Sequence, residues 1–170
     1  GLKVGVYGGS FAGMGDFQVT GEELRRRFGI ELEQADPAEF RELRDSVTER
    51  EIDEELAADR GLYEFPEPLD KELYRLNTRA CLTVRKWVGG LGAFSVNFLK
   101  VSPSGGLDSM PFCEACKAMA RGVGYAGEGD ALTAAFTGAL LQSFPDTSFV
   151  EIFCPDWKNG TVLISHMGEM

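Results

Sequence analysis

Hydrophobic and polar positions along the chain follow two alternating patterns. Short apolar runs with β-branched or aromatic residues predict strands at residues 3–7, 30–34 and 93–98. Helical spacing, often after an N-cap residue, predicts helices at residues 20–29, 36–56, 70–87, 110–121 and 130–142. Strands separated by helices are typical of a parallel sheet that carries helices on its faces. The sequence therefore predicts an α/β fold with a parallel, Rossmann-like sheet.

The pattern changes near residue 145. Residues 147–153 and 161–167 are rich in β-branched and aromatic side chains, and the Asn159-Gly160 pair between them is a strong turn signal. Directly connected strands of this kind predict an antiparallel hairpin. We expect this hairpin to lie outside the parallel sheet, because the strands of that sheet need helical crossovers.

The last third of the chain also holds the candidate chemistry. Glu128 lies in a Gly-Glu-Gly-Asp segment, Glu151 lies in the first hairpin strand, and His166, the only histidine, lies in the second. Two carboxylates and an imidazole suit a divalent ion such as Mn²⁺, and carboxylates beside such an ion can transfer protons. Each residue alone also has a structural or solvated interpretation.

The hairpin register decides whether Glu151 and His166 meet. A two-residue loop at Asn159-Gly160 places them diagonally, and a loop of residues 157–160 places them directly opposite. A three-residue loop with a bulge would separate them. Pro155 favours a bulge, because proline cannot donate to a β ladder.

Composition excludes several classes of protein. The net charge of −10 and a pI near 4.6 argue against a nucleic-acid partner. No apolar run is long enough for a membrane span, so we expect a cytoplasmic protein without a membrane partner. The glycine-rich segment 8–15 follows a strand but fits neither phosphate-loop pattern. We interpret it as a backbone turn at the carboxyl end of a strand, where open α/β sheets bind ligands.

Cys113 and Cys116 form an isolated C-x-x-C motif. A zinc site would need a second pair, and a redox motif would normally open its helix. Their helical spacing with Ala120 favours small residues of a core face. A thiol redox domain remains an alternative and would require a lowered thiol pKa.

Several segments together resemble the L-arabinose isomerase family, with L-fucose isomerases as more distant relatives. The resemblance covers nearly the whole chain and rests on these segments: residues 3–9, the Ser95-Val-Asn-Phe98 strand, residues 110–113, the run 119–130 that ends in Gly-Glu-Gly-Asp, residues 147–151, and Ile164-Ser-His-Met167. Departures from the family pattern include Leu99-Lys100 in place of an acidic pair, and Ala131 in place of Trp.

The resemblance implies a fold and a set of site residues. It implies that Glu128, Glu151 and His166 bind Mn²⁺ or another divalent cation, with the two glutamates as the acid/base pair. Phe11 and Phe98 fall where the family lines its sugar pocket. A fourth ligand, a second histidine, is expected beyond Met170. Residues 1–145 would be the central α/β domain, and residues 146–170 the first hairpin of an incomplete C-terminal β domain.

An aldose–ketose isomerisation fits these residue types. A proton leaves one carbon and arrives at its neighbour through a cis-enediol, while negative charge develops on adjacent oxygens. We expect a fragment of a pentose or deoxyhexose isomerase that is homo-oligomeric at full length and inactive as this chain alone. The alternative is a non-catalytic sugar-binding or assembly domain that kept the fold.

Overall fold

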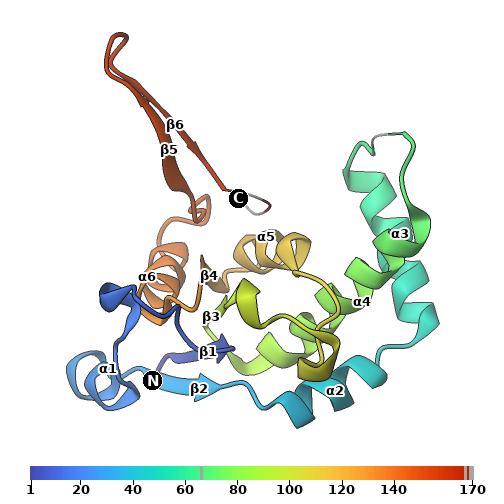
Figure 1. Cartoon of the computed structure of the whole chain (residues 1–170), viewed down its shortest axis with the longest axis horizontal. Coiled ribbons are helices and arrows are strands. Elements are labelled where there is room, and N and C mark those ends of the chain that lie inside the picture. Colours follow the sequence, from blue (N-terminus) through green and yellow to red (C-terminus); the bar gives the residue numbers. More distant parts are fainter. Residues whose placement is uncertain (66, 167, 169–170) are drawn as a thin grey trace.

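A computed structural model describes residues 1–65, 67–166 and 168. Four parallel strands form one sheet in the order β2-β1-β3-β4, and two antiparallel strands form a separate sheet, β5-β6. The predicted α/β class and the separate hairpin are both confirmed. In Figure 1 the hairpin projects away from the α/β body. The described part of the chain has no helix with the length and apolar character needed to cross a membrane.

The elements follow one another along the chain with short connections. The strands are β1 (Lys3–Tyr7), β2 (Glu31–Gln34), β3 (Ala93–Val96), β4 (Gly124–Gly127), β5 (Glu151–Asp156) and β6 (Thr161–Ser165). The α-helices are α1 (Gly21–Phe28), α2 (Pro37–Asp45), α3 (Glu49–Leu62), α4 (Lys71–Trp87), α5 (Phe112–Ala120) and α6 (Ala131–Leu141). Single 3₁₀ turns occur at η1 (Gly15–Phe17), η2 (Val88–Gly90), η3 (Phe98–Lys100) and η4 (Pro103–Gly105).

Side chains alternate between the two faces of the parallel sheet, as the twofold period of a strand requires. On one face, Val4, Val6 and Ala126 belong to a cluster with α1 and α6. On the other face, Phe94 and Tyr125 belong to a larger cluster with α2, α4 and α5. The sheet is therefore covered by helices on both faces, and α3 packs on the outer side of α4 through a third small cluster.

The single long helix predicted at residues 36–56 is wrong. The chain forms two helices there, because Thr48 and Glu51 make a capping box that starts a new helix at Glu49. Asp36 caps α2, and Thr20 caps α1, as predicted. Leu73, Leu76, Ala80, Val84 and Trp87 recur at helical spacing along α4, which predicts one buried face. Only Ala80, Val84 and Trp87 are buried, and Leu73 is 61% exposed.

Strand β4 has no counterpart in the prediction. Its sequence, Gly-Tyr-Ala-Gly, contains two glycines and has little intrinsic strand preference. All four residues are buried, so tertiary context decides the conformation. A Cβ atom added at Gly124 would lie 2.3 Å from the backbone nitrogen of Gly138 in α6. Helix α6 therefore approaches this strand so closely that only glycine fits there.

The hairpin has the four-residue loop that the prediction gave as one alternative. Asp156 pairs with Thr161, and the side chain of Asp156 accepts hydrogen bonds from the loop amides of Lys158 and Asn159. A bulge between Ile152 and Cys154 then shifts the ladder by one residue. Glu151 therefore pairs with Ser165, and its predicted position directly opposite His166 is wrong. Met167, the last residue of the predicted second strand, lies outside the described residues.

Candidate functional site

A cavity of about 480 Å³ lies at the carboxyl ends of β3 and β4, where they approach the start of β5. Parallel strands end at the same edge of a sheet, and the registers bring Tyr7, Val96 and Gly127 side by side there. This edge is the usual ligand site of open α/β sheets. The cavity is lined by Val96, Phe98, Met110, Phe112, Tyr125, Gly127, Glu128, Glu151 and His166.

Glu128 occupies the tight turn between β4 and α6. Its φ of 64° lies in the left-handed region, and Gly129 follows with a φ of 81°. A non-glycine residue in this region is uncommon and must be held by its surroundings. The backbone nitrogen of Glu128 donates to the Val96 carbonyl at 3.2 Å, and its carbonyl accepts from the Phe11 amide at 3.1 Å.

Two polar side chains, one from β3 and one from the glycine-rich segment, form hydrogen bonds with the backbone of the same turn. The Ser95 hydroxyl is fully buried, accepts from the Gly129 amide at 2.9 Å, and donates to the Ala126 carbonyl at 2.6 Å. The Ser10 hydroxyl donates to the Gly129 carbonyl at 3.0 Å. The glycine-rich segment 8–15 thus contacts the Glu128 turn with its own backbone and side chains.

The environment raises the pKa of the Glu128 carboxyl. Burial is the largest cause, and the negative charges of Glu151 and Asp130 add to it. His166 acts in the opposite direction. A carboxyl group whose pKa is raised toward neutrality is better suited to accept and return a proton than one that is always ionised. The effect also shows that Glu128, Glu151 and His166 share one electrostatic environment.

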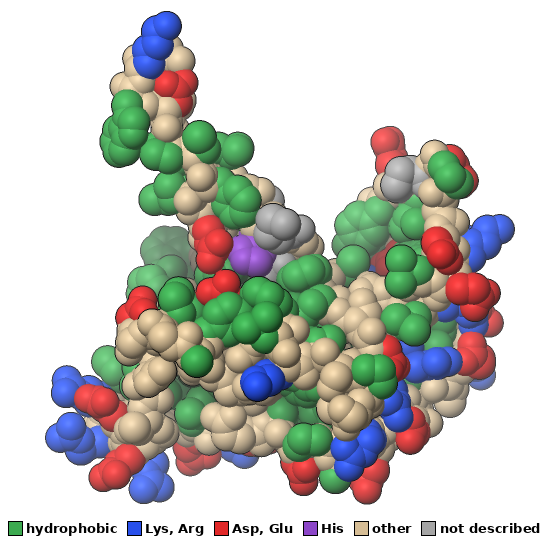
Figure 2. Space-filling view, in the orientation of Figure 1, with side chains coloured by type: hydrophobic (Ala, Val, Ile, Leu, Met, Phe, Trp, Pro, Cys, Tyr) green, Lys and Arg blue, Asp and Glu red, His purple; other side chains and the backbone are tan. Residues whose placement is uncertain are grey.

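Glu151 and His166 are brought together despite the bulge. The imidazole Nε2 of His166 lies 3.9 Å from Oε2 of Glu151, and the histidine side chain is 11% exposed. The imidazole ring packs between Phe149, at 5.3 Å, and Phe112, at 6.4 Å. Figure 2 shows the single histidine at the base of the hairpin, where the hairpin meets the α/β body. The sequence left open whether these two side chains meet, and the structure brings them together even though the hairpin contains a bulge.

The donor types fit a hard divalent cation in part. Two donor atoms bound at about 2.1 Å to one ion are separated by about 3.0 Å at adjacent octahedral positions and by about 3.4 Å in a tetrahedron, so the Glu151–His166 distance of 3.9 Å would have to shorten for both side chains to bind one ion. Glu128 lines the same cavity. In the described part of the chain, however, no group of three or more His, Cys, Asp or Glu side chains lies close enough together to hold a metal ion. A three-donor site would require the cavity to tighten.

The two aromatic residues predicted for the sugar pocket lie in contact. The rings of Phe11 and Phe98 are 4.9 Å apart in an edge-to-face arrangement, and Phe98 is 46% exposed. Phe98 lines the cavity, whereas Phe11 reaches it through this contact and through the turn of Glu128.

The sequence did not predict the apolar side chains that line the cavity, nor the role of a buried polar residue, Asn97, that hydrogen-bonds to the neighbouring backbone. Met110, Phe112 and Tyr125 lie on segments that the sequence assigned only to a helix or to no element. Asn97 is buried, donates to the Gly9 carbonyl at 3.1 Å, and accepts from the Leu99 amide at 3.1 Å. Polar residues at the end of an apolar strand were the available signal for this support.

The fold and the cavity together define a class: a parallel α/β domain whose carboxylates and imidazole converge at the carboxyl edge of its sheet. Residues 14–143 match the family model of the L-arabinose isomerase central domain. The chain belongs to this family, as its resemblance predicted.

Individual relatives support the assignment at low identity. The chain is 28% identical to the L-arabinose isomerase of Vibrio parahaemolyticus over 181 residues, which cover 99% of the chain and 36% of the relative. It is 30% identical to that of Pediococcus pentosaceus over 87% of the chain and 33% of the relative. It is 35% identical to that of Leuconostoc mesenteroides over 59% of the chain and 23% of the relative. The chain thus spans about a third of the length of these curated relatives.

Proposed function

We propose that this chain is part of a metal-dependent aldose–ketose isomerase acting on a pentose or deoxyhexose. Residues 1–145 would form its central domain, and residues 146–170 would begin a C-terminal β domain. The observation that carries the proposal is the convergence of Glu128, Glu151 and His166 on one cavity at the carboxyl edge of the sheet. The names of the relatives support the same reaction class.

The two glutamates would perform the proton transfers. In a cis-enediol mechanism, one carboxylate takes the proton from the carbon next to the carbonyl, and the other exchanges protons with the sugar hydroxyls. Either role would suit Glu128 or Glu151, because both are carboxylates that line the cavity. The raised pKa of Glu128 suits a group that carries the proton between two carbons. A bound Mn²⁺ or other divalent cation would neutralise the charge that develops on the sugar oxygens.

The other lining residues would orient the sugar and exclude water. Glu128, Glu151 and His166 would hold the cation, and the exposed face of Phe98, supported by Phe11, would cover the C–H face of the sugar. The exclusion of water strengthens each electrostatic contact inside the cavity. These roles use both carboxylates and the imidazole that line the cavity.

The hairpin supports the proposal of a larger, homo-oligomeric protein. Its large apolar side chains are exposed on both sides, including Ile152 at 72%, Leu163 at 59% and Trp157 at 89%. An exposed apolar surface of this size normally packs against another domain or subunit. Because the relatives are about three times longer than this chain, further domains would cover the hairpin and complete the metal site.

A non-catalytic sugar-binding domain is the competing function, and one experiment separates the two. The full-length protein is incubated with Mn²⁺ and L-arabinose or L-fucose in D₂O, and the product is followed by NMR. We expect a ketose that carries deuterium from the solvent, because an enediol base exchanges its proton. Glu151→Gln should stop this exchange, and the exposed Glu54→Gln should not. Sugar binding without any ketose would favour the non-catalytic function.

A ketose that forms without solvent deuterium would contradict the proposed exchange of the carboxylate proton with solvent. Turnover that survives in the Glu151→Gln variant would contradict the assigned carboxylate. The two results are distinguishable, because the first concerns the label in the product and the second concerns the rate.

A further inference from the structure

One wall of the candidate cavity is attached to helix α4. Met110 and Phe112 both line the cavity, and they belong to the loop before α5 and to the first residue of that helix. Among the six α-helices of the described chain, α5 alone begins without a hydrogen bond from a capping side chain. The start of α5 therefore depends on contacts from elsewhere in the fold.

Asn77, on α4, supplies two of these contacts. Its side-chain nitrogen donates to the Ser109 hydroxyl at 2.9 Å and to the Met110 carbonyl at 2.8 Å. Its side-chain oxygen accepts from the Cys81 thiol at 3.6 Å, one turn further along the same helix. Both ends of the amide thus form hydrogen bonds, which fixes its orientation and directs its N–H groups at the loop before α5.

The buried face of α5 differs from the prediction. Cys113 is exposed and Cys116 is only partly buried, so this pair does not form the core face that its spacing predicted. The buried residues of the helix are Glu114, Ala115, Ala118 and Met119. Helix α5 thus brings a buried carboxylate to its contact with α4.

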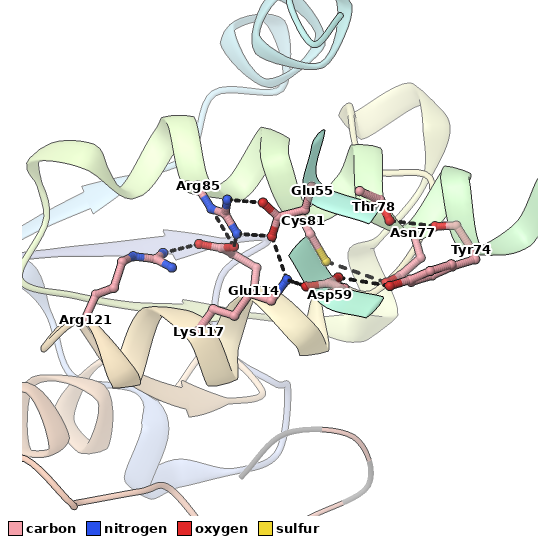
Figure 3. A network of polar contacts seen from close by, with 10 residues as sticks. All are labelled: Glu55, Asp59, Tyr74, Asn77, Thr78, Cys81, Arg85, Glu114, Lys117 and Arg121. Atoms are coloured by element: carbon pink, nitrogen blue, oxygen red, sulfur yellow. Dashed lines mark hydrogen bonds and ion pairs between the residues drawn. The ribbon is translucent and has the colours of Figure 1, made fainter. Parts of the chain in front are cut away.

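Glu114 is the second attachment of this segment to α4. Arg85 donates to one oxygen of the carboxylate at 2.7 Å and at 2.9 Å, and Arg121 pairs with the other oxygen. Figure 3 shows Asn77 and Arg85 on the same helix, with Glu114 facing that helix from α5. Phe112 lies in the chain between the two attachments, so α4 sets its position.

Phe112 in turn supports His166 in two ways. Their rings lie 6.4 Å apart in an edge-to-face arrangement. A Cβ atom added at Gly168 would lie 2.4 Å from Cδ2 of Phe112, so the backbone just after His166 also packs on this ring. The place of the imidazole therefore depends on the place of Phe112.

We propose that Asn77 is a positioning residue for His166. By fixing the loop before α5, Asn77 sets where Nε2 of His166 lies relative to Oε2 of Glu151. Their distance of 3.9 Å must shorten for both groups to bind one ion, and a displaced loop would prevent this. The inference rests on the proposed function only in taking His166 as a ligand of the cation.

NMR of the only histidine in the chain tests the proposal, because its ring signals need no separation from those of other histidines. In Asn77→Asp the side chain keeps its size but loses both N–H donors, and its oxygens repel the Met110 carbonyl. Asn77→Leu removes the same donors without adding a charge. We expect the ring signals of His166 to move in both variants by more than their linewidths, because the ring current of Phe112 acts on them.

Arg79→Gln is the matched control on the same helix. It removes the ion pair of Arg79 with Glu49, on the side of α4 that contacts α3, and leaves Asn77 in place. Its His166 signals should keep their wild-type positions. Signals that move equally in this control, or that stay unchanged in both Asn77 variants, would overturn the proposal.

Two further measurements guard against misfolded variants. Circular dichroism identifies the variants that are folded. In the wild type, a nuclear Overhauser effect should connect the ring protons of His166 and Phe112, and this test needs no substitution. Its absence would overturn the proposal, because the path from Asn77 to the imidazole runs through this contact.

The consequence for the cation is measured separately. Titration of Mn²⁺, followed by electron paramagnetic resonance, should show an affinity lowered about tenfold in both Asn77 variants and unchanged in Arg79→Gln. Unchanged affinity in variants whose His166 signals have moved would overturn the positioning role. A wild-type chain that binds no Mn²⁺ would contradict the proposed function, and the NMR comparison would still decide whether Asn77 sets the position of His166.

Discussion

Replacement of Gly129 by alanine tests how the Glu128 turn is held. At Gly129 the added carbon would lie 2.2 Å from the Gly9 carbonyl oxygen and 2.6 Å from Cα of Ser10. Both atoms belong to backbone, so no side chain can rotate to make room. The glycine-rich segment 8–15 would have to move away from the turn that carries Glu128.

Gly122→Ala provides a control with matched backbone strain. Gly122 has a φ of 86°, close to the 81° of Gly129, but its added carbon has no neighbour within 4 Å. Each variant places alanine in the left-handed region, which costs about 1–2 kcal/mol. Only Gly129→Ala also causes steric overlap, which costs about 1–3 kcal/mol. The same variant weakens the hydrogen bonds of Ser10 and Phe11 with the turn, which costs about 1 kcal/mol more. We therefore expect losses of about 3–6 kcal/mol for Gly129→Ala and about 1–2 kcal/mol for Gly122→Ala.

Urea unfolding followed by tryptophan fluorescence measures both losses. Trp87 is 7% exposed and reports on the core, whereas Trp157 is 89% exposed, so a Trp157→Phe background isolates the core signal. The free energy of unfolding is compared at equal m-values. Equal losses in the two alanine variants, within about 0.5 kcal/mol, would refute the claim that the glycine-rich segment clamps the turn.

Two further predictions concern chemistry and acid stability. In the full-length protein, Glu151→Gln should lower turnover at least 10²-fold with circular dichroism unchanged, whereas Cys113→Ala should leave turnover within about twofold; steady-state kinetics would contradict the assignment if the order were reversed. Arg85 is the main cause that lowers the pKa of Glu55 to about 2 from its ordinary 4.5. The ionised Glu55 carboxylate therefore contributes its full stabilisation of the fold above pH 4.5, and this stabilisation is lost as the pH falls toward 2. Urea midpoints between pH 7 and 3 should fall less steeply in Glu55→Gln than in the wild type, and an unchanged slope would contradict this.

Local signals in the sequence predicted much of the fold. Thr20 and Asp36 act as helix caps, and Gly29 ends α1 in the left-handed conformation. These features depend on residues that are close in sequence, so the local sequence is enough to predict them. The break before α3 also has a local signal, the capping box of Thr48 and Glu51. Charged residues continue on both sides of this box, so the sequence pattern was interpreted as one continuous helix.

The remaining features depend on distant parts of the chain. Strand β4 exists because its weak strand sequence pairs with β3 along one edge and packs against helices α6 and α5. The bulge near Cys154 changed the register but still left Glu151 and His166 3.9 Å apart, because His166 follows the end of β6 and turns toward the sheet. The apolar wall of the cavity consists of residues from a loop, a helix and a strand that only tertiary packing brings together, and spacing along one element does not predict this.

Titration of Mn²⁺ into this chain tests the central claim most directly. Electron paramagnetic resonance measures the free ion, so it detects even the weak binding expected of an incomplete site. We predict one class of weak sites, with affinity lowered at least tenfold by Glu151→Gln and by His166→Gln, and unchanged by the exposed Glu54→Gln. Binding that is the same in all four proteins would contradict the assignment of the metal to the cavity of Glu128, Glu151 and His166.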